Sequence, residues 1–420
     1  MIQKSTLDNG LRAVTTSMPH TRSVTIAFFV GAGSRYEPDD KAGVSHFIEH
    51  LCFKGTPRRP SPKEISEAIE GVGGVMNAGT EQEVTVYWCK VARPHFQLAL
   101  DLLTDMLRFS LFDPLEVEKE RRVIVEELAS TNDHPESRVE LLMDELMWPD
   151  QPMGRDIGGT KESVTTMASQ DIRSCLAAQY TPSNIVLSVA GDISHSEVVE
   201  SAAPYMQGWE SAIPLSWSPA LDGQVKAGIR VERRKTDQAY FSVAFKGLSL
   251  VHPDRHALDL LSTVLGEGMS SRLFIELRER QGLVYDVHSY VNHFLDCGAF
   301  GVSASVDPAR APDALSTVLQ ELRRLKDGVE PRELEKAKEM AKGRLLLRME
   351  DSRSVAYWAG AQEKLLGSIQ TVEQAIEKVE AITAADLTRV AEKVVASEKL
   401  NLAVVGPYRS AKAFRSVLAI

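Results

Sequence analysis

An internal repeat is the feature that most constrains how this chain can fold. Three segments of the first half recur in the same order in the second half, offset by about 215 residues. The matched pairs are 25–30 with 240–245, 94–109 with 312–325, and the apolar strands that end at Gly191 and Gly406. Ordered repeats at a nearly constant offset indicate a duplicated unit. A chain of 420 residues also exceeds what a single hydrophobic core usually serves. The sequence therefore predicts two similar domains.

Each half alternates strand patterns with helix patterns. Residues 24–30 form an apolar run of strand length, and residues 84–91 alternate as a strand should. Residues 94–109 have the apolar spacing of a helix, and Asp113-Pro114 is a good start signal for a long one. We predict an α+β fold with two homologous domains, each a mostly antiparallel sheet with helices packed on one face.

The predicted join between the halves is a stretch rich in turn-forming residues. It carries Pro214, Pro219, Gly223 and several serines. We predict an N-terminal domain of residues 1–210, a linker of residues 211–227, and a duplicated C-terminal domain of residues 228–420.

The composition narrows the classes of partner. The formal net charge of −10 argues against nucleic acid, because phosphate binding needs clustered lysines and arginines. The same charge is compatible with an acidic chamber that attracts basic peptides, although solubility explains it as simply. No apolar run reaches the 18 or so residues that a membrane span requires. We therefore expect no nucleic-acid partner and no membrane span.

The compartment is predicted from the cysteines and the N-terminus. The four cysteines lie far apart without a Cys-x-x-Cys pair, which fits a reducing compartment. The first ten residues lack the basic and then apolar segments of a secretion signal. We expect a bacterial-type cytoplasmic location, with the mitochondrial matrix as the alternative if a transit peptide has been removed.

The strongest local signal is His46-Phe47-Ile48-Glu49-His50. On a helix, His46 and His50 lie one turn apart and project from the same face, so that both imidazoles can bind one metal ion. Glu49 adjoins His50, close enough to reach a metal-bound water without being a ligand. The apolar neighbours that would bury this segment are Phe47, Ile48, Leu51 and Phe53.

A catalytic zinc ion needs a third protein ligand and an open position for water. Glu120 and Glu127 lie seven residues apart on a predicted helix, within about 20° of each other around its axis. Val123 and Ile124 fall between them, and carboxylates on an apolar face are costly to bury unless they are paired or bind a metal. Glu126 points about 100° away from Glu127. Helical phase therefore favours Glu120 and Glu127 over Glu126, without deciding which of the two is the ligand.

The order His-x-x-Glu-His resembles that of the pitrilysin-type, or inverzincin, metallopeptidases. In that family 76 residues separate the second histidine from a glutamate ligand, which corresponds to Glu127 here. Residues 120–127 resemble the matching segment of the mitochondrial processing peptidase beta subunit and its bacterial single-unit relatives. The resemblance implies that Glu120 supports the site from behind the ligands. Such outer partners commonly matter by about 10- to 100-fold.

Two further resemblances concern substrate binding. Residues 73–80 resemble the family strand that pairs with an extended substrate, which implies substrate-binding roles for Asn77 and Ala78. Arg278 and Tyr285 have the seven-residue spacing of the pair with which the family grips substrate beside the zinc ion. Both side chains can donate hydrogen bonds to a peptide carbonyl as negative charge develops on it.

The resemblance implies a zinc-dependent endopeptidase with Glu49 as general base. The second half has no His-x-x-Glu-His at the equivalent position, so we expect one Zn²⁺ per chain. Two chains would enclose a chamber that admits peptides and unfolded segments. A homodimer is the simpler expectation, because the chain carries both the metal motif and the Arg–Tyr pair.

Several alternatives remain open at this stage. A heterodimer with an inactive homologue is possible, as is a non-catalytic scaffold subunit of a peptidase-like complex. A different zinc hydrolase, which would cleave small amides rather than peptides, is a further alternative. The substrates could be presequences that are trimmed or free peptides that are degraded.

Overall fold

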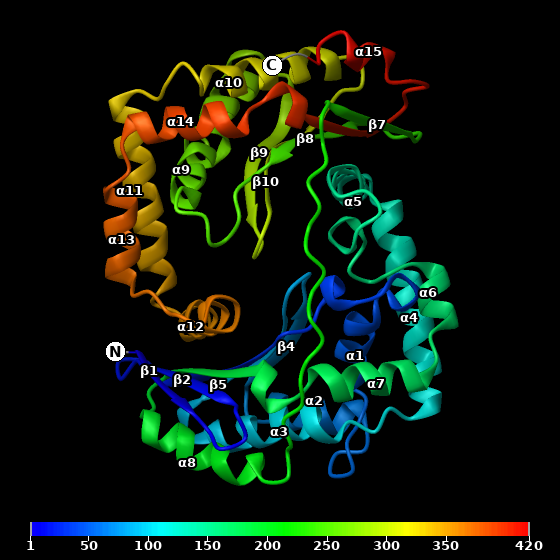
Figure 1. Ribbon diagram of the computed structural model, residues 1–420, viewed down its shortest axis with the longest axis vertical. Helices are drawn as coiled ribbons and strands as arrows, with labels where there is room; N and C mark the ends of the chain where they lie inside the picture. The colour runs from blue at the N-terminus through cyan, green and yellow to red at the C-terminus, as the bar shows by residue number, and fades with distance from the viewer. Residues whose placement is uncertain (1, 419–420) are drawn as a thin grey trace. The chain divides into compact units, whose positions relative to one another are not determined.

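Two β-sheets organise the computed structural model, which describes residues 2–418 (Figure 1). The first sheet has the strand order β1-β2-β6-β3-β5-β4. Its strands are β1 (Ile2–Thr6), β2 (Arg12–Ser17), β3 (Ser23–Val30), β4 (Val75–Thr80), β5 (Thr85–Ala92) and β6 (Ile185–Gly191). Only β2 and β6 pair in parallel, and the other neighbours are antiparallel.

The second sheet has the order β7-β11-β8-β10-β9. Its strands are β7 (Gly228–Arg233), β8 (Ala239–Lys246), β9 (Val284–His293), β10 (Gly298–Val306) and β11 (Asn401–Gly406). Here only β7 and β11 pair in parallel. Apart from the extra strand β1, the two sheets share one topology, with β6 and β11 in equivalent places. The predicted α+β fold with two mostly antiparallel sheets is confirmed.

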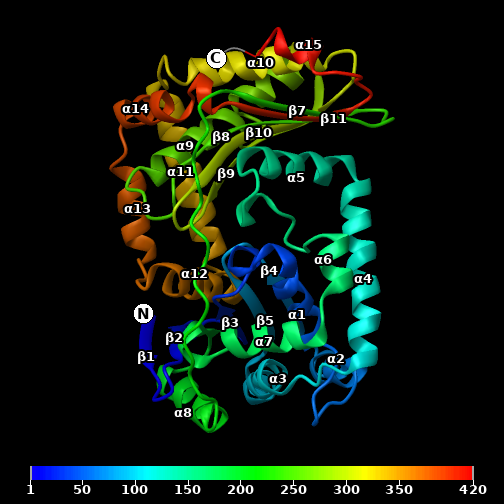
Figure 2. The ribbon, with the colours of Figure 1, turned by 45° about the vertical axis from the view of Figure 1, so that its right-hand side comes forward.

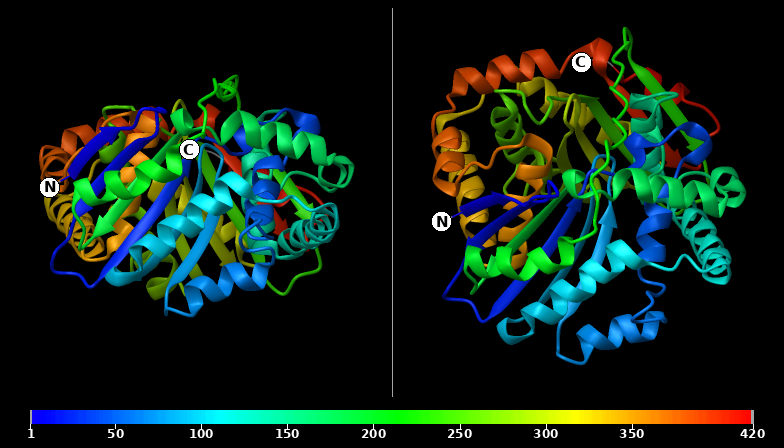
Figure 3. Two further views of the ribbon diagram at one scale, coloured as in Figure 1. Left: turned by 90° about the horizontal axis from the view of Figure 1, so that it is seen from below. Right: turned by 60° about the horizontal axis from the view of Figure 1, so that its bottom comes forward.

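The first sheet buries one face under a layer of helices. Its helices, in chain order, are α1 (Val44–Cys52), α2 (Pro62–Glu70), α3 (Phe96–Phe109), α4 (Pro114–Asp133), α6 (Lys161–Thr166), α7 (Ser169–Gln179) and α8 (His195–Met206). Alternate residues of β3, such as Ile26 and Phe28, join Leu103 of α3 and Val198 of α8 in one core. Figure 3 shows α3 and α8 against this sheet.

The second sheet is covered in the same way. Its helices are α9 (Arg255–Gly266), the π-helical segment η6 (Phe274–Arg280), α10 (Ala311–Arg324), α11 (Pro331–Arg348), α13 (Val372–Glu380), α14 (Ala384–Val394) and α15 (Lys412–Arg415). Phe241 and Val243 of β8 pack with Leu261 of α9 and Leu319 of α10. Within residues 2–418, no helix is both long and apolar enough to cross a membrane.

Two helices, α5 (Pro135–Met147) and α12 (Ser352–Leu366), cover the opposite faces of the sheets. α5 comes from the first half of the chain, yet it packs on β7, β8 and β11 of the second sheet (Figure 2). α12 comes from the second half and packs on β2, β3 and β6 of the first sheet. Each sheet therefore has its layer of helices on one face and one helix from the other half of the chain on the other face.

This exchange makes both compact units discontinuous in sequence. One unit comprises residues 1–129, 155–218 and 346–370, and the other comprises residues 130–154, 219–345 and 371–420. The predicted domains, 1–210 and 228–420, were each a single continuous segment. The chain passes between the units at five points, one of which lies between Ser218 and Pro219, inside residues 211–227. The sequence pattern did not predict that residues 130–154 belong to the second unit and residues 346–370 to the first.

Candidate metal centre

The histidines of the motif lie on α1, whose sequence separates a buried stripe from a polar one. Phe47, Ile48 and Leu51 are fully buried in the core of the first unit. His46 and His50 lie on the opposite stripe of the helix and are partly exposed, with 22% and 17% of their side chains accessible. Burial of the apolar stripe therefore fixes the direction in which both imidazoles project.

The start of α1 is held by a buried carboxylate from outside the helix. Gly43 occupies the N-cap with φ 91°, and a Cβ there would lie 2.3 Å from the carbonyl oxygen of Gly158. With no side chain at this cap, Glu37 accepts hydrogen bonds from the backbone N–H groups of Gly43 and Ser45, at 2.7 and 2.8 Å. Burial raises the pKa of Glu37, and these hydrogen bonds oppose that rise. Glu37 thus anchors the helix that carries the motif.

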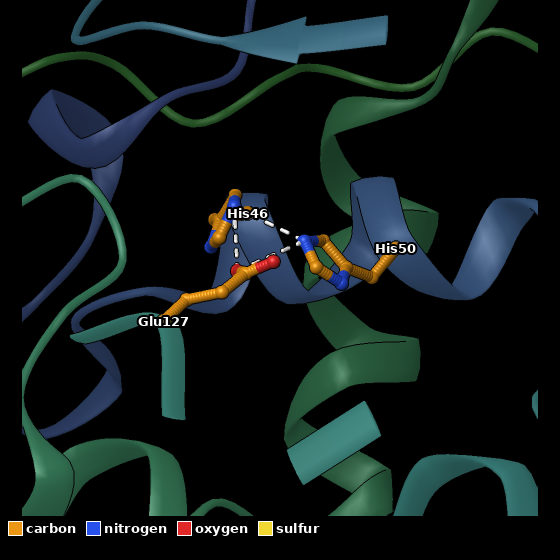
Figure 4. Close-up of side chains that lie close together, drawn as sticks. All are labelled: His46, His50 and Glu127. Carbon is orange, nitrogen blue, oxygen red and sulfur yellow. Dashed lines mark hydrogen bonds and ion pairs between the residues drawn. The ribbon is translucent and has the colours of Figure 1, made fainter. Parts of the chain in front are cut away.

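Three ligand atoms converge at one point (Figure 4). The Nε2 atoms of His46 and His50 lie 3.2 Å apart. One carboxylate oxygen of Glu127 lies 3.9 Å from Nε2 of His46 and 3.5 Å from Nε2 of His50. Bonds of about 2.0–2.1 Å to a tetrahedral zinc ion place neighbouring ligand atoms about 3.3 Å apart. The residues present therefore fit a zinc ion.

The protonation of His46 suits a metal ligand. Burial, with a smaller contribution from the neighbouring His50, lowers the pKa of His46 to about 4. The imidazole is therefore neutral at pH 7 and offers a lone pair. Its Nδ1 atom is buried, and it has no hydrogen-bond partner among residues 2–418.

The two candidate glutamates of α4 have different environments. Glu120 is buried, accepts a hydrogen bond from Nδ1 of His50 at 3.0 Å and forms an ion pair with Lys54 Nζ at 2.7 Å. This contact fixes the imidazole with its Nε2 atom toward the ligand cluster, as partners behind metal ligands commonly do. Glu127 instead presents its carboxylate to the Nε2 atoms. The geometry thus separates the two residues that helical phase left equivalent.

The exposure of α4 differs in part from the prediction. The face between Glu120 and Glu127 was expected to be apolar and buried, and Ile124 is indeed buried. Val123, however, is 42% exposed, and the side chain of Glu127 is 49% exposed. The buried stripe of α4 runs through Val117, Glu120, Ile124 and Leu128, and Val123 and Glu127 lie on the exposed stripe beside it. Burial cost therefore explains the pairing of Glu120 and has no bearing on Glu127.

Glu49 lies on α1 between the histidines and meets β4. Thr80, the last residue of β4, donates a hydrogen bond from Oγ1 to Glu49 Oε2 at 2.6 Å. Burial raises the pKa of Glu49, and the hydrogen bond from Thr80 opposes that rise. No role for Thr80 at the site was predicted from the sequence. Strand alternation places Ala78 and Thr80 on one face of β4, but the sequence does not show that this face meets α1.

Asn77 and Ala78 lie on β4, which is the edge strand of the first sheet. Within residues 2–418, β4 pairs only with β5, so its other edge has free backbone hydrogen-bonding groups. Asn77 is exposed and Ala78 is half-buried. The strand that was predicted to pair with substrate therefore has a free edge, and the same strand ends at Thr80.

Arg278 and Tyr285 lie together on the second unit. An N–H of the Arg278 guanidinium donates to the backbone carbonyl of Tyr285 at 2.8 Å, and the guanidinium carbon lies 5.1 Å from the centre of the tyrosine ring. Arg278 comes from η6, and π-helical turns often occur at functional sites. Tyr285 is 74% exposed, so its hydroxyl can meet a ligand.

The sequence of this chain is similar to those of known proteins. Residues 12–161 match the family described as Insulinase (Peptidase family M16), and residues 166–341 match the family described as Peptidase M16 inactive domain. An uncharacterized zinc protease of Streptomyces coelicolor is 36% identical over 99% of this chain and 91% of its own length. The uncharacterized zinc protease YmxG of Bacillus subtilis is 34% identical over 97% of this chain and 98% of its own. This chain belongs to peptidase family M16.

Solved structures agree with the M16 fold. A protease from Helicobacter pylori has a TM-score of 0.90 at 23% identity, covering 97% of this chain and 99% of its own. A structure described as a peptidase M16 inactive domain from Pseudomonas fluorescens has a TM-score of 0.89 at 18% identity, with the same coverage. The predicted resemblance to pitrilysin-type peptidases is confirmed at the level of the M16 family.

Proposed function

We propose that this M16 protein is a zinc-dependent endopeptidase that uses His46, His50 and Glu127 as metal ligands and Glu49 as general base. The observation that carries the proposal is the convergence of two Nε2 atoms and one carboxylate oxygen at 3.2–3.9 Å, beside a further carboxylate that is not among the three ligands. Three protein ligands leave one tetrahedral position for water or substrate, as in catalytic zinc sites.

His46, His50 and Glu127 would hold a zinc ion, which would polarise the scissile carbonyl as a Lewis acid and lower the pKa of a water molecule. Glu49 takes the proton from that water at a carboxylate oxygen, as the oxygen of the water attacks the carbonyl carbon. Glu49 then returns the proton to the leaving amine nitrogen as the C–N bond breaks. Thr80 keeps one oxygen of Glu49 engaged at 2.6 Å, which limits the rotamers that the carboxylate can adopt.

The free edge of β4 supports an extended substrate. A peptide that pairs with the backbone at Asn77 and Ala78 adds a strand to the sheet, and such pairing tolerates many side chains. Because β4 ends at Thr80, which contacts Glu49, a peptide bound along β4 is led toward the catalytic carboxylate. Arg278 and Tyr285 are the proposed donors to the substrate carbonyl.

We further propose that two copies of the chain enclose the reaction, each supplying Arg278 and Tyr285 to the zinc site of its partner. The proposal rests on the M16 resemblance and on the presence of both sets of residues in one sequence. A homodimer follows most simply, and a heterodimer with an inactive M16 homologue is the alternative. The curated relatives compared above are bacterial, which supports a bacterial cytoplasmic setting.

The alternative that this chain is a non-catalytic scaffold subunit depends on which residues match the family described as inactive. That description applies to residues 166–341, whereas every proposed metal ligand and Glu49 lie within residues 12–161. A scaffold subunit has no need to keep three convergent ligand atoms. The intact ligand set therefore favours the enzyme.

The test combines metal analysis with digestion of an unfolded peptide library. We expect Glu49→Gln to keep one zinc ion per chain while its hydrolysis rate falls by about 10²–10⁴-fold, because only the proton transfer is removed. Glu127→Gln should lose zinc and activity together. Glu126→Gln, one residue earlier on the exposed side of the same helix, is the matched control and should keep both. Full activity in the Glu49→Gln variant would refute the proposed role of Glu49.

A further inference from the structure

A pocket of about 430 Å³ lies within the second unit, built from parts that the proposed peptidase chemistry does not use. Its walls are the end of α5 with the turn that follows, the segment 221–228, and the ends of β8 and β11. The apolar side chains that line it are Leu146, Met147, Pro149, Leu221, Val225 and Ala227. Pockets of this size and apolar character are typical small-molecule sites.

Lys246, the last residue of β8, is the one deeply buried cation of this lining. It is only 7% exposed. Among residues 2–418 its ammonium group makes no hydrogen bond within 3.5 Å and no ion pair within 4.0 Å. Its ammonium group lies over the ring of Trp148, with Nζ 4.6 Å from the ring centre. A buried ammonium group normally has an anion or several acceptors.

The surroundings of Lys246 destabilise the protonated, charged form of its ammonium group. Burial lowers the pKa of Lys246, and the exposed Asp222 and the thiol of Cys297 oppose this effect from a distance. Lys226 also lines the pocket, but it is exposed and can be solvated by water. An anion that enters the pocket would therefore meet one desolvated cation in its lining.

The wall formed by the linker is fixed by hydrogen bonds. The side chain of Gln151 accepts from the backbone N–H of Leu221 at 2.6 Å and donates to its carbonyl at 3.1 Å. Gln224 and Asn401 exchange a second pair of side-chain hydrogen bonds, at 3.0 and 3.2 Å. The side-chain amides in the lining are thus engaged with the protein, which leaves the ammonium of Lys246 as the buried side-chain donor of the lining without a hydrogen-bond partner.

We propose that this pocket binds a small organic monoanion, with an apolar body against the aliphatic walls and a carboxylate that accepts a hydrogen bond from Lys246 Nζ. A single buried cation matches one negative charge. A phosphate group commonly needs several donors, such as a helix N-terminus or an arginine fork, which the lining does not offer. The proposal is independent of the peptidase chemistry, since no metal ligand contributes to the pocket.

The test is isothermal titration of the zinc-loaded, full-length protein with three eight-carbon probes of different charge. Octanoate should bind saturably, octan-1-ol should bind about 10- to 100-fold more weakly, and octylammonium should not bind measurably. The expected ratio is that of a charge-assisted hydrogen bond. This series uses only the wild-type protein, so it does not depend on the folding of any variant.

Two variants locate the site. Lys246→Met keeps a linear side chain and removes the charge, and it should weaken octanoate binding to the level of octan-1-ol. Lys226→Met, which removes the exposed lysine of the same lining, is the matched control and should change octanoate affinity less than threefold. Equal affinity of wild type for octanoate and octan-1-ol, or unchanged octanoate binding by Lys246→Met, would overturn the proposal.

Discussion

At the scale of single residues, the contact between Thr80 and Glu49 joins β4, the strand proposed to bind substrate, to the proposed base. The hydroxyl of Thr80 donates to Glu49 at 2.6 Å, and the hydroxyl of Thr85 lies 3.3 Å from it and shares its single proton between Thr80 and the carbonyl of Ala32. Thr85 itself donates to the backbone carbonyl of Ala32 at 3.0 Å. Thr80 is therefore held from behind, and its own proton is directed at the carboxylate.

We expect Thr80→Val to lower kcat about tenfold while KM and zinc content stay near wild type. Valine has the shape of threonine and suits a strand, so only the donated hydrogen bond is lost. Thr80→Ser keeps the donor and should restore most of the rate. Steady-state kinetics on one peptide, together with zinc analysis, provide the measurement. If the serine and valine variants were equally slow, the hydroxyl would have no role in positioning Glu49.

At the scale of elements, α12 depends on close contact with the first sheet. A Cβ at Gly360 of α12 would lie 2.1 Å from the ring of Phe29 on β3. The helix is also joined to the sheet by polar contacts: Ser188 donates to the carbonyl of Ala356 at 2.8 Å, and Thr25 and Ser352 share a hydrogen bond at 2.9 Å. The small residue at 360 lets the helix approach the sheet.

We predict opposite effects for two glycine substitutions in helices. Gly360→Ala should lower the free energy of unfolding by about 1–3 kcal/mol, because the added methyl group forces Phe29 or the helix to move. Gly343→Ala in α11 has nothing within 4 Å of the added atom. It should raise stability by about 0.5–1 kcal/mol through helix propensity. Urea unfolding of the two variants and wild type measures both values, and destabilisation by Gly343→Ala would contradict this explanation.

α5 carries a strongly perturbed carboxyl group where it packs on the second sheet. Burial, together with the nearby carboxylates of Glu140 and Glu145, raises the pKa of Asp144 to about 7. The folded state therefore holds this proton more tightly than the unfolded chain, in which an aspartate titrates near 3.9. As pH rises from about 4 to 7, the unfolded state ionises first and the folded state loses relative stability.

Asp144→Asn should therefore stabilise the protein increasingly across this range. Relative to wild type, its melting temperature should change little between pH 3.5 and 4, rise as the pH approaches 7, and level off above pH 7. Thermal unfolding in a series of buffers is the measurement. Asp150→Asn, at an exposed aspartate just after the same helix, is a useful control. A difference that did not depend on pH would mean that Asp144 has an ordinary pKa.

At the scale of the whole molecule, the proposed sharing of sites between two chains has a direct consequence. A chain with Glu49→Gln lacks the base, and a chain with Arg278→Ala and Tyr285→Phe lacks the proposed substrate donors. In a mixed dimer with shared sites, one site combines both defects and the other combines both intact sets. Sites within one chain offer no such rescue.

Co-expression of the two inactive chains should therefore restore about a quarter of the wild-type activity per chain. About half of the dimers formed are mixed, and each mixed dimer has one intact site of two. Each variant expressed alone serves as the control and should stay inactive. Absence of rescue in dimers shown to be mixed would argue that the Arg–Tyr pair serves its own chain or none.

Local features of the site and of the sheets could be predicted from the sequence, because residues close together in the chain determine them. The spacing of His46 and His50 and the apolar residues between them define a helix with two imidazoles on one side. Helical phase on α4 favoured Glu120 and Glu127 over Glu126 as the third ligand, although Glu126 and Glu127 are both exposed. The repeated order of strands likewise indicated two related mostly antiparallel sheets.

Contacts between distant segments were decided only by the tertiary structure. Glu120 meets Nδ1 of His50 while Glu127 meets its Nε2, a distinction that depends on how α4 crosses α1. The hydrogen bond from Thr80, the exchange of α5 and α12 between the sheets, and the burial of Lys246 arise in the same way. A periodic pattern records which side of an element is buried, but it does not record which partner buries it, because that choice minimises the free energy of the whole chain.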